Sequence, residues 1–439
     1  MLGLGRSGLA AARLLHRLGG AVTVCDSGDS AELRERAELL RGEGIMVITG
    51  PEAESDAGRY DLAVLSPGIE ETTPLVRNVT DKGIPMIGEL ELAHSLCRCP
   101  VIAITGSNGK TTTTELTTLM LQGAGLKAVS CGNIGTPMSE LIGTGESWDV
   151  LVAEVSSFQL ETIRAFRPKV AVWLNLSPNH LDRYPSMKEY RDAKLRIFEN
   201  QRDSDIVVMP FGEELPVPKG RVITFSTTDE GADLTLRGSE IMHRGKRIMD
   251  LKETKLHGAH NAANIMAALG CGIALEQDLS VMVRTIRDYT PPAHRCELIA
   301  EHGGVRWIND SKATNLDAME QAIRSVPAPL ILIAGGKDKG FGFAPIAPLV
   351  RERVEFAILI GEIRHRIAGE WEGIESAAVD TLEEAVNLAF AKAMDKAKDS
   401  GNCATVLLSP GTSSYDMFRD YTERGDTFRK LVNSHARTQ

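Results

Sequence analysis

A strand-like run that leads into a glycine-rich loop and a helix is the feature that most constrains this chain. Residues 101–105, VIAIT, are apolar, and the sequence continues GSNGKTTTTELTTLML. Gly106 and Gly109 allow a tight turn whose N–H groups point inward, and the following helix adds the positive end of its dipole. Lys110 can reach a terminal phosphate, and the Thr111 hydroxyl can bind a phosphate-bound Mg²⁺. The stretch therefore predicts a triphosphate-binding loop in an α/β sheet.

The loop is shorter than the common Walker pattern. That pattern places a glycine five residues before Gly109, where this chain has Ile104. A glycine-rich turn without a ligand is the alternative interpretation. The strand before the loop and the helix after it favour nucleotide binding.

Composition narrows the classes of protein that can carry this loop. At about 150 residues per domain, a chain of 439 residues predicts about three domains. No apolar run is long enough to span a membrane and no segment resembles a signal peptide, so we expect a cytoplasmic protein without membrane insertion. The net charge of −10 argues against a nucleic-acid partner. The seven scattered cysteines predict reduced thiols rather than a zinc site.

The order of strands and helices divides the chain into three α/β sections. Residues 1–97 hold GLGRSG, an apolar helix and the strands AVTVCD and YDLAVLS. Residues 98–291 alternate helices with the strands VIAIT, DVLVAEVS, KVAVWLNL, DIVVMP and RVITFS, and carry a polar hairpin insert at 234–251. Residues 292–439 repeat the theme with VRWIND, LILIAGG, FAILIG and TVLLSPG. The alternation predicts mostly parallel sheets with helices on both faces.

GLGRSG opens the first section and is followed by an acid, Asp26, 18 residues after Gly8. This spacing is typical of a dinucleotide fingerprint, although a tight strand–helix turn without a ligand explains it as well. The fingerprint requires a strand before it, and only Met1 and Leu2 precede Gly3. We therefore expect the first strand to be missing or the start of the chain to be truncated.

Several polar residues follow apolar strands of the second section. Glu154 ends one strand and His180 follows the next, so both belong to the edge of the sheet where ligands bind. A carboxylate there suits Mg²⁺, with a salt-bridged strand end as the alternative; a histidine taken alone is as often structural. Periodicity alone favours a solvated side chain at Lys194. The H-x-x-H of His257 and His260 lacks the acid of a zinc protease motif, so we expect no metal there.

Two loops of the third section are suited to an anionic group. NDSKATN follows a strand and combines an acid, a hydroxyl, a lysine and an amide, although a surface turn tolerates the same residues. GGKDKGFGF places Lys337 and Lys339 on a glycine-rich loop, and a further strand-end loop carries Ser413 and Ser414.

Taken in order, twelve motifs resemble those of the Mur ligases of peptidoglycan synthesis, and more narrowly those of the branch that adds D-glutamate. They are GLGRSG, SPGI, TGSNGKTTT, GNIGTP, EVSSFQLE, NHLDRY, AKLRIF, GAHNAAN, HRCE, NDSKATN, GGKDKG and SPGTSSYDMFRDYTERG. The resemblance covers nearly the whole chain, and the ordered set is far more specific than any single motif. It implies an α/β protein of three domains: a Rossmann-like domain at 1–97, a central P-loop ATPase-like domain at 98–291 and a Rossmann-like domain at 292–439.

The resemblance also implies an activity. Such an enzyme would be a monomer that uses ATP and Mg²⁺ to join D-glutamate to UDP-N-acetylmuramoyl-L-alanine through an acyl phosphate. The positions implied for ATP are Gly106, Ser107, Asn108, Gly109, Lys110, Thr111, Thr112, Asn261, Asn264, Arg295 and Asp310. Those for the UDP-linked substrate are Gly5, Arg6, Ser7, Asp26, Ser66 and Asn133, and those for D-glutamate are Thr314, Lys339, Ser414 and Tyr421. The catalytic set is Lys110, Glu154, His180 and Lys194, and the metal set is Thr111, Glu154, His180 and Lys194, the last as a carbamate.

The chain departs from the family pattern at two positions. Asn179 stands where many relatives have an acid, and Tyr421 where many have Phe. Lys337 competes with Lys339 for one role, and counting from the double glycine favours Lys339. Two other functions stay open at this point: a nucleotide-dependent oxidoreductase built on GLGRSG, and a P-loop switch that binds ATP and signals to a partner.

Overall fold

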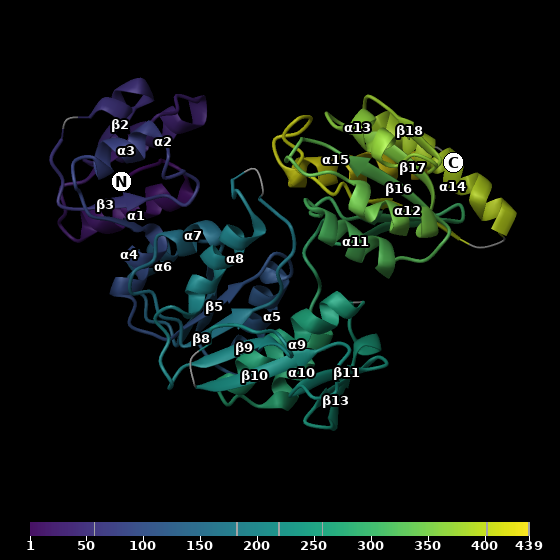
Figure 1. The fold of residues 1–439 in the computed structure, drawn as a ribbon, viewed down its shortest axis with the longest axis horizontal. Helices are drawn as coiled ribbons and strands as arrows, with labels where there is room; N and C mark the ends of the chain where they lie inside the picture. The colour runs from purple at the N-terminus through teal and green to yellow at the C-terminus, as the bar shows by residue number, and fades with distance from the viewer. Residues whose placement is uncertain (57, 181–182, 218–219, 257, 401–402, 438–439) are drawn as a thin grey trace. The chain divides into compact units, whose positions relative to one another are not determined.

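The structure is a computed structural model and describes residues 1–56, 58–180, 183–217, 220–256, 258–400 and 403–437 (Figure 1). His257, the first histidine of the H-x-x-H motif, lies outside the described residues. The chain forms two compact units, which are described separately. The first unit comprises Met1–Asn175, Lys188–Thr254 and Asn261–Tyr289, and the second comprises Leu176–Met187, Lys255–His260 and Thr290–Gln439. None of the helices in the described ranges has the length and apolar character to cross a bilayer.

The amino-terminal part of the first unit is a small parallel sheet with a core on each face. Its strands are β1 (Thr23–Asp26), β2 (Met46–Thr49), β3 (Ala63–Leu65) and β4 (Met86–Gly88). Its helices are α1 (Arg6–Arg17), α2 (Ala31–Gly42), η1 (Gly50–Ser55), α3 (Pro74–Thr80) and α4 (Glu89–Leu96). Apolar residues of α1, α2 and α4 form one core cluster, and those of η1 and α3 form the other. Helices therefore cover both faces of the sheet, as predicted.

Met1 to Gly3 lie between β1 and β3, where a doubly wound sheet has its central strand. Leu2 makes isolated parallel bridges to Cys25 on one side and to Leu65 on the other. Its N–H donates to the Val64 carbonyl at 2.8 Å, and the Gly3 N–H donates to the Cys25 carbonyl at 2.8 Å. These three residues supply the backbone connection that leads into the GLGRSG loop.

The central part of the first unit is a nine-stranded sheet in the order β13-β12-β11-β10-β9-β8-β5-β7-β6. Its strands are β5 (Val101–Thr105), β6 (Ala128–Gly132), β7 (Val150–Glu154), β8 (Val170–Trp173), β9 (Ile206–Pro210), β10 (Arg221–Ser226), β11 (Leu234–Arg237), β12 (Glu240–His243) and β13 (Lys246–Asp250). Its helices are α5 (Lys110–Gly123), α6 (Met138–Gly143), α7 (Ser157–Glu161), α8 (Met187–Leu195), η2 (Arg196–Phe198), η3 (Leu251–Glu253), α9 (Ala259–Ala274) and α10 (Leu279–Asp288).

Across the sheet, each neighbouring pair from β6 through β7, β5, β8, β9 and β10 to β11 is parallel. The strand β12 pairs antiparallel with both β11 and β13. The predicted mostly parallel sheet and the polar hairpin insert are both confirmed, and the insert contributes three strands. The apolar runs predicted as strands correspond to β5 and β7–β10. Sequence analysis missed β6, because AVSCG has neither an unbroken apolar run nor a clear alternation.

Two glutamates of α4 connect the small sheet to the central part of the same unit. Glu91 accepts hydrogen bonds from the backbone N–H groups of Arg164, Ala165 and Phe166 at 2.8–2.9 Å. Glu89 accepts from the Ser139 N–H at 2.7 Å, next to the start of α6. Burial raises the pKa of Glu89. Both carboxylates are buried, so this contact is stabilised by polar bonds that solvent does not reach.

The second unit contains a six-stranded sheet in the order β14-β15-β19-β16-β17-β18, in which only β14 is antiparallel. Its strands are β14 (Glu297–His302), β15 (Val305–Asn309), β16 (Leu330–Gly335), β17 (Val354–Ile360), β18 (Ser376–Ala378) and β19 (Ala404–Leu408). Its helices are α11 (Leu316–Ser325), η4 (Ala344–Ile346), α12 (Ala347–Arg353), α13 (Arg364–Glu370), α14 (Leu382–Ser400) and α15 (Tyr421–Arg437). One core cluster lies under α11, α12 and α13 and the other under α14 and α15, so both faces are covered.

Candidate functional site

The loop between β5 and α5 is held by its own lysine and by the end of β8. Lys110 Nζ donates to the carbonyls of Gly106 at 2.8 Å and Ser107 at 2.9 Å. The Ser107 N–H donates to the Asn175 carbonyl, and the Asn108 N–H to the Asn175 side-chain oxygen at 2.9 Å. Gly109 has φ +82°, a left-handed conformation that glycine adopts without strain. The predicted phosphate loop is thus formed as a turn that leads directly into a helix.

Asn264 lies directly against this loop. A Cβ at Gly109 would come within 2.1 Å of the Asn264 side-chain oxygen. The Asn264 amide also donates to the Asn261 side-chain oxygen at 3.4 Å, one turn earlier on α9. The structure therefore brings both asparagines predicted for ATP to the phosphate loop.

Glu154, at the end of β7, is held from two sides. One carboxylate oxygen accepts from the Thr111 hydroxyl at 2.8 Å, and the other accepts from the Asn133 side-chain amide at 2.9 Å. Glu154 is 2% exposed, and both of these hydrogen bonds come from neutral side chains rather than from the cation that the alternative interpretation, a salt-bridged strand end, requires. In the described part of the chain, no group of three or more His, Cys, Asp or Glu side chains is arranged to hold a metal ion. Mg²⁺ commonly takes one or two protein oxygens and completes its shell with phosphate and water, so Thr111 and Glu154 fit it.

Lys194 is buried beside the same loop. It is 2% exposed, and its Nζ donates to the Gly106 carbonyl at 3.0 Å, the oxygen that Lys110 also contacts. Burial, and then the nearby charge of Lys110, lower the pKa of Lys194 well below its usual value. The solvated side chain that periodicity favoured is therefore wrong, because α8 turns this face toward the loop.

His180 belongs to the second unit and is described with it. Its φ is +57°, unusual for a residue with a side chain, and the carbonyl of His180 accepts from the N–H groups of Arg183 and Tyr184. The Asn179 side chain accepts from the His180 N–H at 3.0 Å. The Asn179 side chain thus holds the backbone of the turn at His180.

Two residues predicted for the UDP-linked substrate, Asp26 and Ser66, lie at the carboxyl ends of β1 and β3, whereas Asn133 lies after β6 against Glu154. Asp26 accepts from the Leu4 N–H at 2.7 Å with one oxygen and from the Gly28 N–H at 2.8 Å with the other. Ser66 donates its N–H to the Leu2 carbonyl at 2.9 Å. A Cβ at Gly8 would come within 2.0 Å of the Gly3 carbonyl, so this glycine allows α1 to approach the strand. Of the remaining candidates, Gly5 caps α1, Arg6 is exposed and Ser7 is half-buried.

Four residues predicted for D-glutamate lie on neighbouring loops of the second unit. Lys339 Nζ donates to the Thr314 carbonyl at 3.3 Å. Ser414 is 2% exposed, and Tyr421 begins α15 with Lys312 Nζ 3.8 Å from its ring centroid. The competing residue, Lys337, is exposed and pairs with Glu362 at 3.2 Å. This geometry favours Lys339.

Asp310 lies at the end of β15. Its oxygens accept from the Cys296 N–H at 3.1 Å and from the Ser409 hydroxyl at 2.9 Å. Burial raises the pKa of Asp310 to about 7. Arg295 is half-buried on the preceding turn. Both residues belong to the second unit, whereas Asn261 and Asn264 belong to the first.

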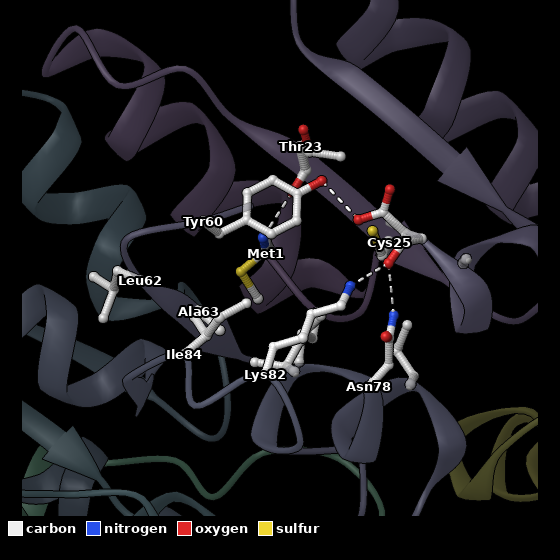
Figure 2. A pocket seen from close by; sticks show the side chains of 14 residues that line it. Met1, Thr23, Cys25, Tyr60, Leu62, Ala63, Asn78, Lys82 and Ile84 are labelled. Carbon is white, nitrogen blue, oxygen red and sulfur yellow. Dashed lines mark hydrogen bonds between the residues drawn. The ribbon is translucent and has the colours of Figure 1, made fainter. Parts of the chain in front are cut away.

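A pocket in the first unit lies at the opposite ends of the small sheet's strands (Figure 2). It includes Thr23 at the start of β1 and Ala63 at the start of β3, whereas Asp26 and Ser66 lie at or beyond the ends of those strands. Tyr60 donates to Asp56 at 2.8 Å beside it. The pocket is therefore separate from the loops that carry the predicted site residues.

Sequence analysis missed two residues that support the phosphate loop. Asn175 bonds the backbone of Asn108 in both directions, at 2.9 and 3.1 Å. The Tyr190 hydroxyl lies 3.2 Å from the Ser107 hydroxyl, and the Tyr190 ring lies under Lys194. A signal existed for both: Asn175 is an amide just after an apolar strand, and Tyr190 precedes Lys194 by one helical turn.

Three family profiles match the chain. Residues 1–88 match the description "Mur ligase MurD-like, N-terminal domain", residues 104–272 "Mur ligase middle domain", and residues 294–410 "Mur ligase, glutamate ligase domain". Curated proteins from Pelobacter propionicus and Koribacter versatilis, both named UDP-N-acetylmuramoylalanine–D-glutamate ligase, are 42% and 41% identical to it. The alignments cover 99% of this chain and 98% and 97% of those proteins.

Solved structures share the fold at lower identity. UDP-N-acetylmuramate–alanine ligase MurC from Thermotoga maritima aligns with a TM-score of 0.64 at 19% identity, over 99% of this chain and 98% of that one. MurF ligase from Thermotoga maritima in complex with ADP aligns with a TM-score of 0.59 at 16% identity, over 87% and 97%. At these identities the likeness establishes the three-part α/β architecture.

Proposed function

The chain belongs to the Mur ligase family, and we propose that it is an ATP-dependent ligase that joins D-glutamate to UDP-N-acetylmuramoyl-L-alanine in peptidoglycan precursor synthesis. The observation that carries the proposal is near-complete alignment, at 38–42% identity, with eight relatives that all have the same ligase name. The match extends through all three parts of the chain, including the loops that we propose to bind the amino acid.

The phosphate loop provides the first chemical step. A carboxylate is a poor electrophile at neutral pH, and transfer of a phosphoryl group from ATP converts it to an acyl phosphate with a good leaving group. Lys110 would stabilise the charge that develops on the transferred group. Its present acceptors are backbone carbonyls of the same loop, so it can reach a phosphate without moving a secondary-structure element. Asn261 and Asn264 would contact the nucleotide from α9.

Magnesium would be held by Thr111 and Glu154 and would supply charge neutralisation on the phosphates. Glu154 already accepts from the Thr111 hydroxyl, so the two oxygens lie close enough to share one ion. Asn133 would orient the carboxylate from its other side. His180 is the further ligand that the family resemblance implies, and we propose it on that ground alone.

Lys194 would act as a carbamate, formed when the nitrogen of its neutral amine bonds to the carbon of CO₂ and releases a proton to solvent. Burial lowers the pKa of this amine, which favours the uncharged form that reacts with CO₂. The product is an anion placed beside Lys110 and the phosphate loop. Two ammonium groups at one carbonyl repel each other, whereas a carbamate opposite Lys110 does not.

The substrates would approach from separate parts of the chain. Gly5, Arg6, Ser7, Asp26 and Ser66 would hold the uridine nucleotide, and Asn133 would face its muramoyl part. Thr314, Lys339, Ser414 and Tyr421 would hold D-glutamate, and Arg295 and Asp310 would contact ATP. Because these residues belong to two units, we expect their closure to gate turnover. A monomer working in the cytoplasm stays a prediction.

One assay tests the proposal. Purified protein is supplied with ATP and Mg²⁺, and ADP release is measured with UDP-N-acetylmuramoyl-L-alanine, with D-glutamate, and with both. We expect sustained release only with both substrates, accompanied by a product whose mass equals the sum of the two substrates minus water. Release without any acceptor would indicate a P-loop switch, and nicotinamide-dependent redox activity would indicate the oxidoreductase. Either result would contradict the ligase assignment.

A further inference from the structure

The helix that follows the last site loop carries a fully buried arginine. Arg424, in the first turn of α15, is 1% exposed. Its Nε donates to the Ser311 hydroxyl at 3.0 Å, and its Nη2 donates to the carbonyls of Ser311 at 2.9 Å and Thr412 at 3.3 Å. One guanidinium therefore bonds two loops, one after β15 and the other after β19.

The third loop, after β16, packs against the same guanidinium. A Cβ at Gly336 would lie 2.3 Å from the Ser413 carbonyl and 3.3 Å from Arg424 Nη1, so only glycine fits there. The Thr412 hydroxyl donates to the Lys337 carbonyl at 2.5 Å, and the Lys337 N–H donates to the Ser413 carbonyl at 2.9 Å. The position of the Thr412 segment thus sets the position of the glycine-rich loop.

These segments carry the residues assigned to the amino acid. Thr314 lies three residues after Ser311, Ser414 lies two after Thr412, and Lys339 lies three after Gly336. The Ser311 hydroxyl donates to the carbonyl of Tyr421, the remaining member, at 2.7 Å. Arg424 itself is not among the four, and its side chain is buried beneath the loops that hold them.

Stability alone does not explain a guanidinium at this position. Removing a charged group from water costs more free energy than its hydrogen bonds return, unless every donor of the group has a partner. A protein with an apolar side chain of similar size in its place is often at least as stable. Here Nη1 is buried and has no hydrogen-bond partner among the described residues. Burial lowers the pKa of Arg424 to about 9, against the smaller opposing effect of the charges of Asp416 and Asp310. What the group does provide is a fixed, planar set of donors that no other side chain offers.

We propose that Arg424 is a positioning residue for the acceptor amino acid: it fixes the three strand-end loops so that Thr314, Lys339, Ser414 and Tyr421 converge on one substrate carboxylate. The inference rests on the proposed function. Small displacements of such loops weaken binding because each substrate bond depends on a group placed by a different segment. The role concerns binding of the amino acid and does not extend to the phosphate loop of the other unit.

The test compares Arg424→Met and Arg424→Lys with the wild-type protein. The KM values for D-glutamate, ATP and the UDP-linked substrate are measured together with kcat and the melting temperature. Losing bonds from a charged donor predicts a KM for D-glutamate raised about tenfold or more in Arg424→Met, with the KM for ATP unchanged and no loss of melting temperature. Arg424→Lys keeps the charge without the planar fork, so its KM for D-glutamate should also rise.

Arg429→Lys is the matched control, because this arginine lies on the same helix but pairs with Glu297 at the surface. It should leave every KM unchanged.

In Arg424→Ala, millimolar guanidinium should lower the KM for D-glutamate again, as the free ion takes the vacant place. An unchanged KM for D-glutamate in folded variants would overturn the inference. A fall in kcat and in melting temperature together with a rise in all three KM values would also overturn it. If Arg424→Met does not fold, the KM of Arg424→Lys decides. Failure of the proposed function is distinguishable, since the wild type would then show no D-glutamate-dependent ADP release.

Discussion

At the scale of single residues, two lysines compete for one backbone oxygen. Lys110 and Lys194 both donate to the Gly106 carbonyl, from the loop and from α8 respectively. Two full charges there would repel each other in a poorly solvated place, and the lowered pKa of Lys194 reflects this burial and repulsion. The lowered pKa of Lys194 favours its neutral amine, which is the form that the proposed carbamate requires.

The first prediction concerns Lys110. Lys110→Ala should lower kcat by about 10²–10³-fold, because the residue supplies charge to the transferred phosphoryl group. The melting temperature should change little, since we assign the side chain to phosphate charge rather than to packing. Steady-state ADP release and thermal unfolding measure the two effects. Lys252→Ala, an exposed lysine outside the site, is the control, and wild-type turnover in a folded Lys110→Ala would refute the phosphate-loop assignment.

The second prediction concerns Lys194. Lys194→Ala should lose about 10²-fold or more in kcat, and a small carboxylic acid such as acetate should restore part of it, because a free anion can occupy the place of the carbamate. Titration with acetate and with acetamide separates charge from size. Equal rescue by acetamide, or wild-type activity in the alanine variant, would rule out a carbamate. In the wild-type protein, intact mass under CO₂-saturated and CO₂-depleted buffer supplies an independent check.

At the scale of elements, the strand–loop–helix unit depends on two features of Gly109. Its positive φ disfavours any side chain, and its missing Cβ lets Asn264 of α9 approach the loop. Gly125, at the end of α5, has a similar φ of +90° but nothing within 4 Å of its Cβ position. Comparing substitutions at the two glycines therefore separates the effect of backbone strain from the effect of the contact with Asn264.

The third prediction uses this pair. Gly125→Ala should cost about 1–2 kcal/mol of stability, from backbone strain alone, and leave the KM for ATP unchanged. Gly109→Ala should cost at least as much and also raise the KM for ATP, because Asn264 must move. Thermal unfolding and ATP kinetics on both variants provide the comparison. Identical ATP kinetics in the two would show that the Asn264 contact is unimportant.

Sequence patterns predicted some strands of this fold accurately and missed others. Apolar runs predicted β5, β9 and β16 within one residue at each end, and β8 within three, since a strand buried on both faces reads as a nearly continuous apolar run. β2, β4, β6, β14 and β18 were missed. The segments AVSCG of β6 and SAA of β18 are short and mix small with polar residues. The three-stranded insert β11–β13 was recognised only as a hairpin, since its third strand is more polar than apolar.

At the scale of the whole molecule, the proposed reaction is divided between two units. Lys110, Thr111 and Glu154 belong to the first, and Thr314, Lys339 and Ser414 belong to the second. In the proposed reaction the acyl phosphate forms before the amino acid attacks, and Arg295, Asp310 and His180 are residues of the second unit that are assigned to this first step. A defect in amino-acid binding should therefore leave the first step intact.

The fourth prediction follows from that division. Lys339→Ala should still form the acyl phosphate, trapped as a hydroxamate with hydroxylamine, while the KM for D-glutamate rises strongly because its carboxylate loses a charged partner. Lys337→Ala should behave like the wild type in both assays, since that lysine pairs with Glu362 at the surface. Lys110→Ala should give no hydroxamate. Sensitivity of Lys337 instead of Lys339 would reverse the assignment of the two lysines.

The sequence by itself determined what depends on local geometry. The turn at Gly106 and Gly109, the helix that begins at Lys110 and the strand that ends at Glu154 follow from residues adjacent in the chain. The family resemblance rested on the same kind of information, an ordered series of short motifs. Because each motif carries its own backbone geometry, its place at the end of a strand could be predicted without knowing the order of strands in the sheet.

Only the tertiary structure decided which of these residues meet. Lys194 is buried because α8 packs beside a loop some 85 residues earlier in the chain, and no periodicity in α8 predicts that partner. Asn133 reaches Glu154 because β6 and β7 are neighbours in the sheet. Arg424 bonds residues 113 and 12 positions away, so its role is invisible in the local pattern YTERG. Contacts of this range depend on strand order and helix packing, which arise from the burial of whole faces rather than from any single segment.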